Sequence, residues 1–193
     1  MKIESEKIAL RPFETEFAAT FYQWYYSGKY DEYFRHCGET FRLADFQKFV
    51  ESPTIKIFCT FEKETGNLIG TCGIYDINHY DKSCKLMVMQ DEGNRNKGYM
   101  FDALKLLCDL MFIGYRFHKI SVAVLETNER VNALTLKGGF EFESKQIESS
   151  WHGGRYINEN IYYMLESKFK EKYYGICTSG STGSSSSTSG EGS

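Results

Sequence analysis

The stretch that decides the fold of this chain is Gln90-Asp91-Glu92-Gly93-Asn94-Arg95-Asn96-Lys97-Gly98-Tyr99. It follows an apolar run, residues 86–89, and precedes a long segment with helical apolar spacing, residues 101–117. A helix start leaves about four backbone N–H groups without intrahelical partners and carries about half a positive charge. Gly98 allows a phosphate to approach the backbone closely, and Arg95 and Lys97 add charge. The sequence therefore predicts a binding site for a phosphorylated ligand.

Length and composition limit the class of protein. The 193 residues suit one domain with a sizeable core, and 41% hydrophobic residues supply the side chains to fill it. The net charge of −3 argues against a general nucleic-acid binder. No apolar run approaches the ~20 residues that a membrane span needs, and the N-terminus lacks the apolar core of a signal peptide. We therefore expect a cytoplasmic protein with neither a nucleic-acid nor a membrane partner.

The six cysteines do not match a metal or redox motif, because no two of them are spaced C-x-x-C. Cys108 falls on a helical apolar face, and Cys59 and Cys72 fall in strand-like runs. The simplest interpretation is reduced structural thiols in the protein core. We therefore expect no metal cofactor.

Apolar periodicity and turn residues predict a mixed sheet with helices on both faces. The segment between the first two helices, residues 28–40, is rich in Tyr, Phe and charge and receives no assignment. The predicted strands are residues 8–13, 55–61, 68–75, 84–89, 120–125, 140–147 and 156–165. The predicted helices begin at residue 14 or 15, 43, 101 and 128, and end at residues 25, 50, 117 and 136.

The last sixteen residues differ in composition from the rest of the chain. Residues 178–193 are Ser, Thr and Gly with one acidic residue, Glu191. Without a large apolar residue, such a segment cannot offset the entropy of ordering, and Gly/Ser tracts behave as flexible linkers. We therefore place the domain at residues 1–177 and expect residues 178–193 to be a disordered tail, either a native tether or an appended expression segment.

Three pieces of the sequence resemble the GCN5-related N-acetyltransferase (GNAT) superfamily. Residues 95–100 fit the family's pyrophosphate-loop pattern of Arg or Gln, two residues, Gly, one residue, and Gly or Ala. Residues 124–134 are similar to the strand-to-helix segment beside the cofactor arm, and Lys137-Gly138-Gly139-Phe140 is similar to the family's lysine-x-glycine-phenylalanine stop. The likeness covers residues 8–165. The opening Leu10-Arg11-Pro12-Phe13 resembles the subgroup typified by ribosomal-protein N-terminal acetyltransferases.

The resemblance implies an α/β fold with a central, mostly antiparallel twisted sheet of six to seven strands and helices on both faces. The sheet of this family splays between its fourth and fifth strands, and the slot holds acetyl-coenzyme A as co-substrate. One strand pairs with the pantetheine arm, the loop cradles the pyrophosphate, and an asparagine approaches the pantetheine or the thioester. The residues that the resemblance assigns to the cofactor are Met87, Val88, Met89, Arg95, Asn96, Lys97, Gly98, Tyr99, Met100 and Asn128.

The implied reaction transfers an acetyl group to a primary amine of a protein N-terminus or a small molecule, by direct attack on the thioester. The amine must be neutral, so a base or a water chain is needed. Glu126 ends a strand near the slot, and its alternative role is a solvated strand end. Asn128 is either a helix cap or a ligand of the cofactor, and the two roles are compatible. Thr135 occupies the position where many relatives carry a tyrosine as general acid.

Two departures from the family pattern keep a second function open. Met100 stands where the family prefers Gly or Ala, and threonine at position 135 is a far poorer acid than tyrosine. The alternative is a GNAT-fold binding or assembly module without turnover, for example a viral or other structural component, with the tail as a tether. For Arg95 and Lys97 the alternative is an ordinary basic turn in solvent. A homo-oligomer or a protein partner also stays open.

Overall fold

The computed structural model describes residues 3–26, 42–152 and 154–176. Eight strands form one open sheet in the order β1-β2-β3-β4-β5-β6-β8-β7. The strands are β1 (Ile3–Glu4), β2 (Ile8–Pro12), β3 (Lys56–Glu62), β4 (Leu68–Asn78), β5 (Ser83–Gln90), β6 (Lys119–Leu125), β7 (Glu141–His152) and β8 (Arg155–Leu165). The helices are η1 (Thr15–Phe17), α1 (Ala18–Tyr26), α2 (Leu43–Val50), η2 (Glu92–Asn94), α3 (Tyr99–Cys108), η3 (Asp109–Gly114), α4 (Glu129–Lys137) and α5 (Glu166–Tyr174).

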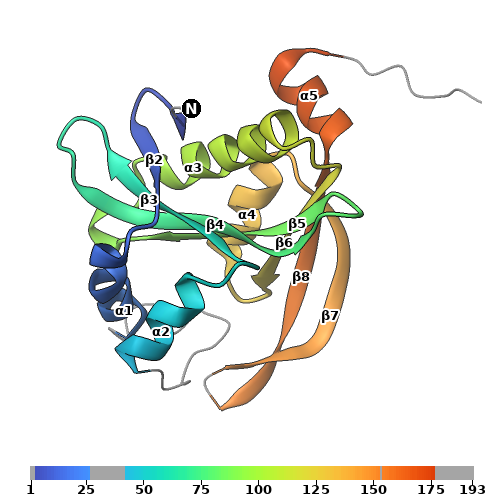
Figure 1. Cartoon of the computed structure of the whole chain (residues 1–193). Helices are drawn as coiled ribbons and strands as arrows, with labels where there is room; N and C mark the ends of the chain where they lie inside the picture. Colours follow the sequence, from blue (N-terminus) through green and yellow to red (C-terminus); the bar gives the residue numbers. More distant parts are fainter. Residues whose placement is uncertain (1–2, 27–41, 153, 177–193) are drawn as a thin grey trace, which may run out of the picture.

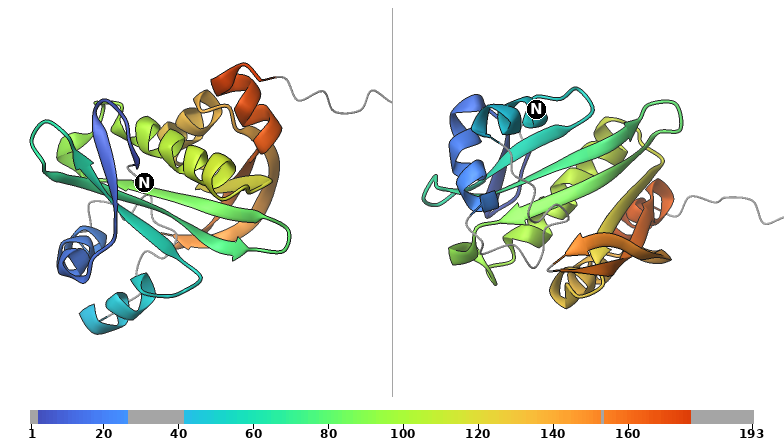
Figure 2. Two further views of the ribbon diagram at one scale, coloured as in Figure 1. Left: turned by 45° about the horizontal axis from the view of Figure 1, so that its top comes forward. Right: turned by 90° about the horizontal axis from the view of Figure 1, so that it is seen from below.

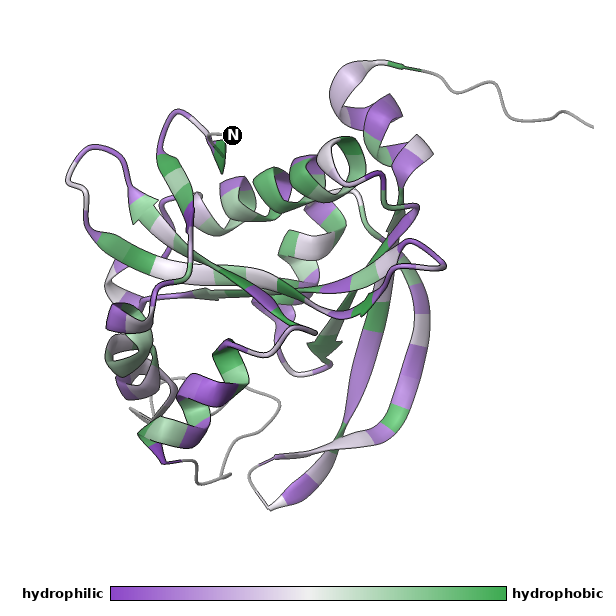
Figure 3. Cartoon of the chain, in the orientation of Figure 1, coloured by the Kyte–Doolittle hydropathy of each residue, from purple (hydrophilic) through white to green (hydrophobic). Residues whose placement is uncertain are grey.

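The helices cover both faces of the sheet. Figure 1 shows α3 lying along one face and α1 and α2 packed on the other, and the left view of Figure 2 shows the same division. The β7–β8 hairpin extends beyond the rest of the sheet and carries mostly hydrophilic residues (Figure 3). Within the described ranges, no helix is long and apolar enough to cross a bilayer.

The sheet is interrupted between β5 and β6, its only parallel neighbours among the described strands. Three residues of each strand pair, with Ser83 opposite Lys119 and Lys85 opposite Ser121. Beyond this point, residues 86–90 of β5 pair with β4 on one side only, while β6 continues to pair with β8 up to Leu125. The two halves of the sheet therefore splay apart. The resemblance implies this splay between the fourth and fifth predicted strands, which are β5 and β6 here because β1 is an additional strand. The right view of Figure 2 shows the divergence of the two halves from below.

The larger hydrophobic core lies between the sheet and α3. The side chains of Leu107, Met111 and Ile120 have no exposed surface there. Phe169 of α5 is equally buried, with its ring centroid 5.1 Å from that of Phe112, and Val131 of α4 packs against the same cluster. This core fixes the start of α3 relative to the splayed strands, because helix and sheet bury their apolar faces against each other.

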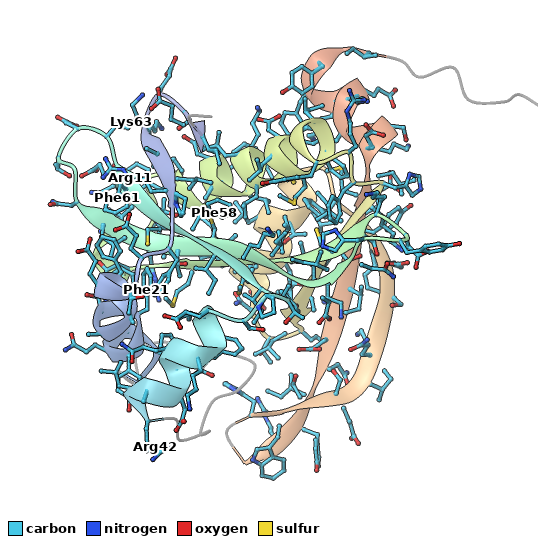
Figure 4. The ribbon with its side chains drawn as sticks, in the orientation of Figure 1. Arg11, Phe21, Arg42, Phe58, Phe61 and Lys63 are labelled. Carbon is cyan, nitrogen blue, oxygen red and sulfur yellow. The ribbon has the colours of Figure 1, made fainter. Side chains whose placement is uncertain are left out.

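A second core holds α1 and α2 against the opposite face of the sheet. It contains Phe21, Phe46 and Phe61, and rings of η1 and α1 surround it. The Phe17 ring meets the Phe61 ring edge-on at 5.6 Å between centroids. Arg11 of β2 lies over the other side of Phe61, with its guanidinium carbon 4.5 Å from the ring centroid (Figure 4). Aromatic side chains of the N-terminal region are thus part of the protein core.

Most predicted elements are present, and α2 has the predicted bounds, but several details of the prediction were wrong. The sheet has eight strands instead of six to seven, because residues 3–4 pair with β2. The predicted helix over residues 101–117 ends at Cys108 and continues as the π-helical η3. The predicted strand over residues 68–75 is longer, since β4 extends to Asn78, which pairs with Ser83. Helix α5 was not predicted. Residues 28–40 and the tail at 178–193 lie outside the described residues.

The unpredicted helix α5 offers a test of the larger core. We expect Phe169→Ala to lower the free energy of unfolding by about 3–5 kcal/mol, because it leaves a cavity in a fully buried site. Phe142→Ala removes the same ring from a side chain that is 53% exposed and should cost about 1 kcal/mol or less. Denaturant unfolding followed by circular dichroism measures both. Equal losses in the two variants would contradict the packing of α5.

Candidate functional site

A cavity of about 470 Å³ occupies the gap between the splayed strands. Its walls come from the unpaired part of β5, the end of β6, and the starts of α3 and α4. Residues of the basic turn before α3, and of α2, β4 and β8, complete its lining. The lining residues are Phe49, Thr54, Ile55, Tyr75, Asp76, Leu86, Met87, Val88, Met89, Gln90, Arg95, Met100, Leu104, Val122, Ala123, Val124, Leu125, Asn128, Arg130, Val131, Leu134, Thr135 and Glu159.

The cavity brings together seven of the residues singled out from the sequence. Met87, Val88, Met89, Arg95, Met100, Asn128 and Thr135 all line it. Backbone N–H and C=O groups on the open edge of β5 have no strand partner there among the described residues, so they are free to pair with an extended ligand arm. Asn96, Lys97, Gly98 and Tyr99 lie on the adjacent turn and do not form the cavity wall.

The backbone of the basic turn before α3 has the conformation that a phosphate needs to approach it closely. Gly98 caps α3 with φ of +85°, and Asn96 also has a positive φ of +67°. A Cβ on Gly98 would meet open space, the nearest atom being the ammonium of Lys7 at 3.8 Å. A ligand atom therefore has room beside Gly98 at the start of α3, close to the Lys7 ammonium and on the same turn as Arg95 and Lys97. Tyr99 turns away, buried against the sheet, and its hydroxyl donates to Glu62.

Asn128 begins α4 and is 8% exposed in the cavity wall. Its Oδ1 accepts a hydrogen bond of 3.2 Å from the backbone N–H of Val131, so the cap is present. Thr135, also buried in the wall, donates its hydroxyl to the Val131 carbonyl at 2.8 Å. That proton is committed within the helix, which leaves Thr135 poorly placed to protonate a ligand.

Side-chain hydrogen bonds of Asn132 connect α4 to the end of β6 and to β8. Asn132 was not among the candidate residues predicted from the sequence. Its Nδ2 donates to the Leu125 carbonyl at 3.0 Å and to the Asn128 carbonyl at 2.8 Å. Its Oδ1 accepts from the Tyr162 hydroxyl at 2.7 Å and the Asn160 amide at 3.0 Å. A satisfied network of this kind fixes the helix start, and with it Asn128, relative to β6 and β8.

Glu126 is not brought together with the other candidates. It does not line the cavity; Lys145 donates to its Oε1, and Asn158 donates to its Oε2 at 2.7 Å. These hydrogen bonds, that from Lys145 first, hold the pKa of Glu126 below its usual range. A carboxylate held in its charged form is a weak proton acceptor, so the site geometry favours the structural interpretation of Glu126.

Glu159 is a buried carboxylate that the sequence reasoning did not single out. Its side chain, from β8, is 1% exposed and lines the cavity, and the Ser150 hydroxyl donates to its Oε1 at 2.9 Å. Alternation along β8 could have found it, because Glu159 shares the inward face with Ile157 and Ile161. Asp76 of β4 also lines the cavity, and its Oδ2 is 2.9 Å from Lys85 Nζ.

A metal site is not apparent in the part of the chain that the structure describes. No group of three or more His, Cys, Asp and Glu side chains is arranged there to hold an ion. Four cysteines, at positions 59, 72, 84 and 108, are free and buried. Burial raises the pKa of Cys84 to about 12, so this thiol is neutral and unreactive in the folded protein.

Comparison with known proteins identifies the fold and the family. The model of the acetyltransferase (GNAT) domain family matches residues 7–141, more than half of the chain. The chain belongs to this GNAT family. Among curated proteins, the spermidine N(1)-acetyltransferase of Vibrio cholerae is 27% identical over 103 residues, 53% of this chain. The match spans 60% of that enzyme, which is less than two thirds of its length.

Solved GNAT structures have the same fold. The spermidine N-acetyltransferase of Vibrio cholerae, in complex with CoA and spermine, superposes with a TM-score of 0.79 at 20% identity over 86% of this chain and 99% of that one. A ribosomal L7/L12 α-N-protein acetyltransferase in complex with coenzyme A has a TM-score of 0.76 at 15% identity, over 86% of this chain and 98% of that one. At these identities the likeness concerns the fold alone.

The helix cap at the cavity wall can be tested by unfolding. We expect Asn128→Ala to lower the free energy of unfolding by about 1 kcal/mol, because the N–H of Val131 loses its side-chain partner. Asn128→Asp retains an acceptor oxygen and should lose much less. Urea unfolding of both variants measures the difference. Equal stability of Asn128→Ala and the unaltered protein would refute a stabilising cap.

Proposed function

We propose that this protein is an N-acetyltransferase that transfers the acetyl group of acetyl-coenzyme A to a primary amine. The observation that carries the proposal is the cavity in the splay, whose lining includes both Arg95 of the cationic turn before α3 and the buried Glu159. A ligand with a diphosphate at one end and a thioester at the other suits this arrangement. Family membership supports the same ligand.

In this proposal the pantetheine arm lies along the open edge of β5 and bonds to the backbone of Met87, Val88 and Met89. The diphosphate sits on the first N–H groups of α3, over Gly98, with the charge of Arg95 beside it. The Met100 side chain points into the cavity together with Leu104, so it contributes apolar surface to the arm. Asn128 lies on the opposite wall, where its amide can face the pantetheine.

The chemical step is attack of the amine nitrogen on the thioester carbonyl. Glu159, directly or through water, first takes a proton from the ammonium to give the neutral amine. The C–N bond then forms and the C–S bond breaks, the second nitrogen proton passes to water, and coenzyme A leaves as the thiolate. A backbone N–H of Val88 or Met89 holds the oxyanion. The thiolate needs little help to leave, since a thiol ionises near pH 8–9. No step therefore depends on Thr135.

The acceptor is a cationic amine before it reacts, and the cavity lining includes groups that suit a cation. Asp76 and Glu159 supply carboxylates, and Phe49 and Tyr75 supply aromatic surface. A protein N-terminus and a small aliphatic amine both carry such a group. The Vibrio relative makes a polyamine the first small molecule to test, and its dodecameric structure makes a homo-oligomer the assembly to test. The free, buried thiols fit a reducing, cytoplasmic location.

The proposal is tested by binding and by thiol release. Isothermal titration should detect acetyl-coenzyme A at or below millimolar concentration, and the absence of binding in that range refutes the proposal. A panel of N-terminal peptides and aliphatic amines, including spermidine, should then release free thiol with at least one acceptor. Binding without thiol release across the panel would favour the alternative of a non-catalytic GNAT module, which the committed hydroxyl of Thr135 also fits.

The diphosphate assignment predicts an effect of charge at the start of α3. We expect Gly98→Asp to weaken acetyl-coenzyme A binding about tenfold or more, because a carboxylate there repels the diphosphate and competes for Lys7. Gly98→Asn is the matched control, since Asn has the same size and also tolerates a positive φ. Titration calorimetry of the two folded variants isolates the charge. Equal affinities of the Asp and Asn variants would overturn the assignment.

The proton acceptor can be identified by comparing two carboxylates. We expect Glu159→Gln to lower kcat about 100-fold or more, with acetyl-coenzyme A affinity unchanged, because it removes the base but not the cofactor contacts. Glu126→Gln tests the competing position at the end of β6. Steady-state kinetics by thiol release decides between them. Full turnover of the Glu159 variant, or loss of turnover in the Glu126 variant alone, would contradict the role of Glu159.

A further inference from the structure

The cationic turn before α3 is partly neutralised by the chain's own carboxylates. Arg95 Nη1 lies 3.9 Å from Glu92 Oε1, within the turn itself. Lys97 Nζ lies 3.7 Å from Glu62 Oε1 and donates to Asn94 Oδ1 at 3.1 Å. A polyanionic ligand at this turn therefore meets cations that already have internal counter-charges.

Glu62 differs from Glu92 because it comes from another element, the end of β3. Three groups fix its carboxylate: the Thr65 hydroxyl donates to it at 2.6 Å, the Tyr99 hydroxyl donates to it, and Lys97 faces it. The hydrogen bonds from Thr65 and then Tyr99 hold the pKa of Glu62 below its usual range, so it is charged at neutral pH. Its side chain is only 12% exposed, whereas that of Lys97 is 48% exposed. The carboxylate is thus the fixed partner and the ammonium the mobile one.

The next residue along the chain strengthens this arrangement. Lys63 donates to the Ser5 carbonyl at 3.0 Å, and the Ser5 hydroxyl donates to Asp102 in the first turn of α3 at 2.9 Å (Figure 4 labels Lys63). The end of β3, the N-terminal hairpin and the helix start therefore form one connected unit. Glu62 cannot move away from the helix start when an anion binds there, so its charge stays beside the ligand.

We propose that Glu62 is an internal counter-ion of the coenzyme A diphosphate site, from which Lys97 departs to the diphosphate when the ligand binds. The inference rests on the proposed function and deepens it by naming a residue that sets cofactor affinity without touching the reacting atoms. When the ligand binds, the Lys97 ammonium leaves the Glu62 carboxylate and pairs with the diphosphate. The Glu62 carboxylate stays in place and repels the diphosphate. Glu62 is a positioning residue that weakens coenzyme A binding.

The sign of the effect separates this role from a purely structural one. A structural support would lower affinity when removed. Glu62→Gln instead removes the charge while its amide oxygen still accepts from one of the Tyr99 and Thr65 hydroxyls and its amide N–H donates to the other, and Asn94 still holds Lys97. We therefore expect Glu62→Gln to bind coenzyme A about fivefold more tightly at low ionic strength, as expected for two unit charges about 4 Å apart in a water-like dielectric.

The experiment is isothermal titration of coenzyme A into the full chain, the Glu62→Gln variant and a matched control. Glu143 of β7 also forms an ion pair with a lysine, Lys119 of β6, so Glu143→Gln makes the same charge change at another ion pair. The gain of Glu62→Gln should appear at about 0.01 M ionic strength and vanish near 1 M, where the screening length falls from about 30 Å to about 3 Å. Pantetheine, which lacks the diphosphate, should bind all three proteins equally.

A double-mutant cycle tests whether the effect acts through Lys97. Lys97→Met should weaken coenzyme A binding about twofold in the unaltered chain and about fivefold in the Glu62→Gln background, where the ammonium is no longer shared. The gain of about twofold that Glu62→Gln then retains in the Lys97→Met background is the direct repulsion between the carboxylate and the diphosphate. Unfolding midpoints verify that every variant is folded. Normal binding by the unaltered chain with unchanged or weaker binding by Glu62→Gln would overturn this inference alone. No binding by the unaltered chain would instead refute the proposed function on which it rests.

Discussion

The end of pairing between β5 and β6, just beyond Lys85 and Ser121, is the constraint on which the rest of this structure depends. A parallel pair that continued to Gln90 would satisfy the facing backbone groups and leave no space for a ligand. Once the strands part, those groups need another partner, because unpaired polar groups away from water are costly. Residues at the starts of α3 and α4, the α-helices that come next in the chain after β5 and β6, then line the same gap. The cavity is thus a consequence of topology, and its lining is set by where each strand ends.

Two glycines on β4 keep the β5 side of this gap in place. A Cβ on Gly70 would lie 2.4 Å from the Met89 carbonyl oxygen, and one on Gly73 would lie 2.4 Å from the Lys56 carbonyl oxygen. Only glycine allows β3, β4 and β5 to approach this closely. The strand proposed to hold the pantetheine arm is therefore positioned by its neighbours before any ligand binds, which lowers the entropic cost of ordering the site.

The backbone features of the candidate site could be predicted from the sequence better than the side chains that line it. Strand ends, the basic turn and the cap at Asn128 are local features, so spacing alone located them. Glu159 and Asn132 depend on contacts between elements distant in the sequence, and no local pattern marks a carboxylate as a cavity wall. Helix α5 was missed because its apolar contribution to the core is concentrated in Phe169 and its other positions are mostly polar. The change from α-helix to π-helix after Cys108 was missed because the π-helical segment is only six residues long, too short for its wider spacing to show in an apolar pattern.

Under the proposed function, the distribution of charge around the cavity follows from what coenzyme A must do in a catalytic cycle. Acetyl-coenzyme A and the product coenzyme A carry the same diphosphate, so contacts to it stabilise substrate, transition state and product equally. Such uniform binding does not accelerate the chemical step, and excessive affinity retains the product. In the arrangement proposed above, the carboxylates beside Arg95 and Lys97 lower that affinity without reaching the thioester. Partial neutralisation of the turn therefore weakens binding and leaves the chemical step unchanged.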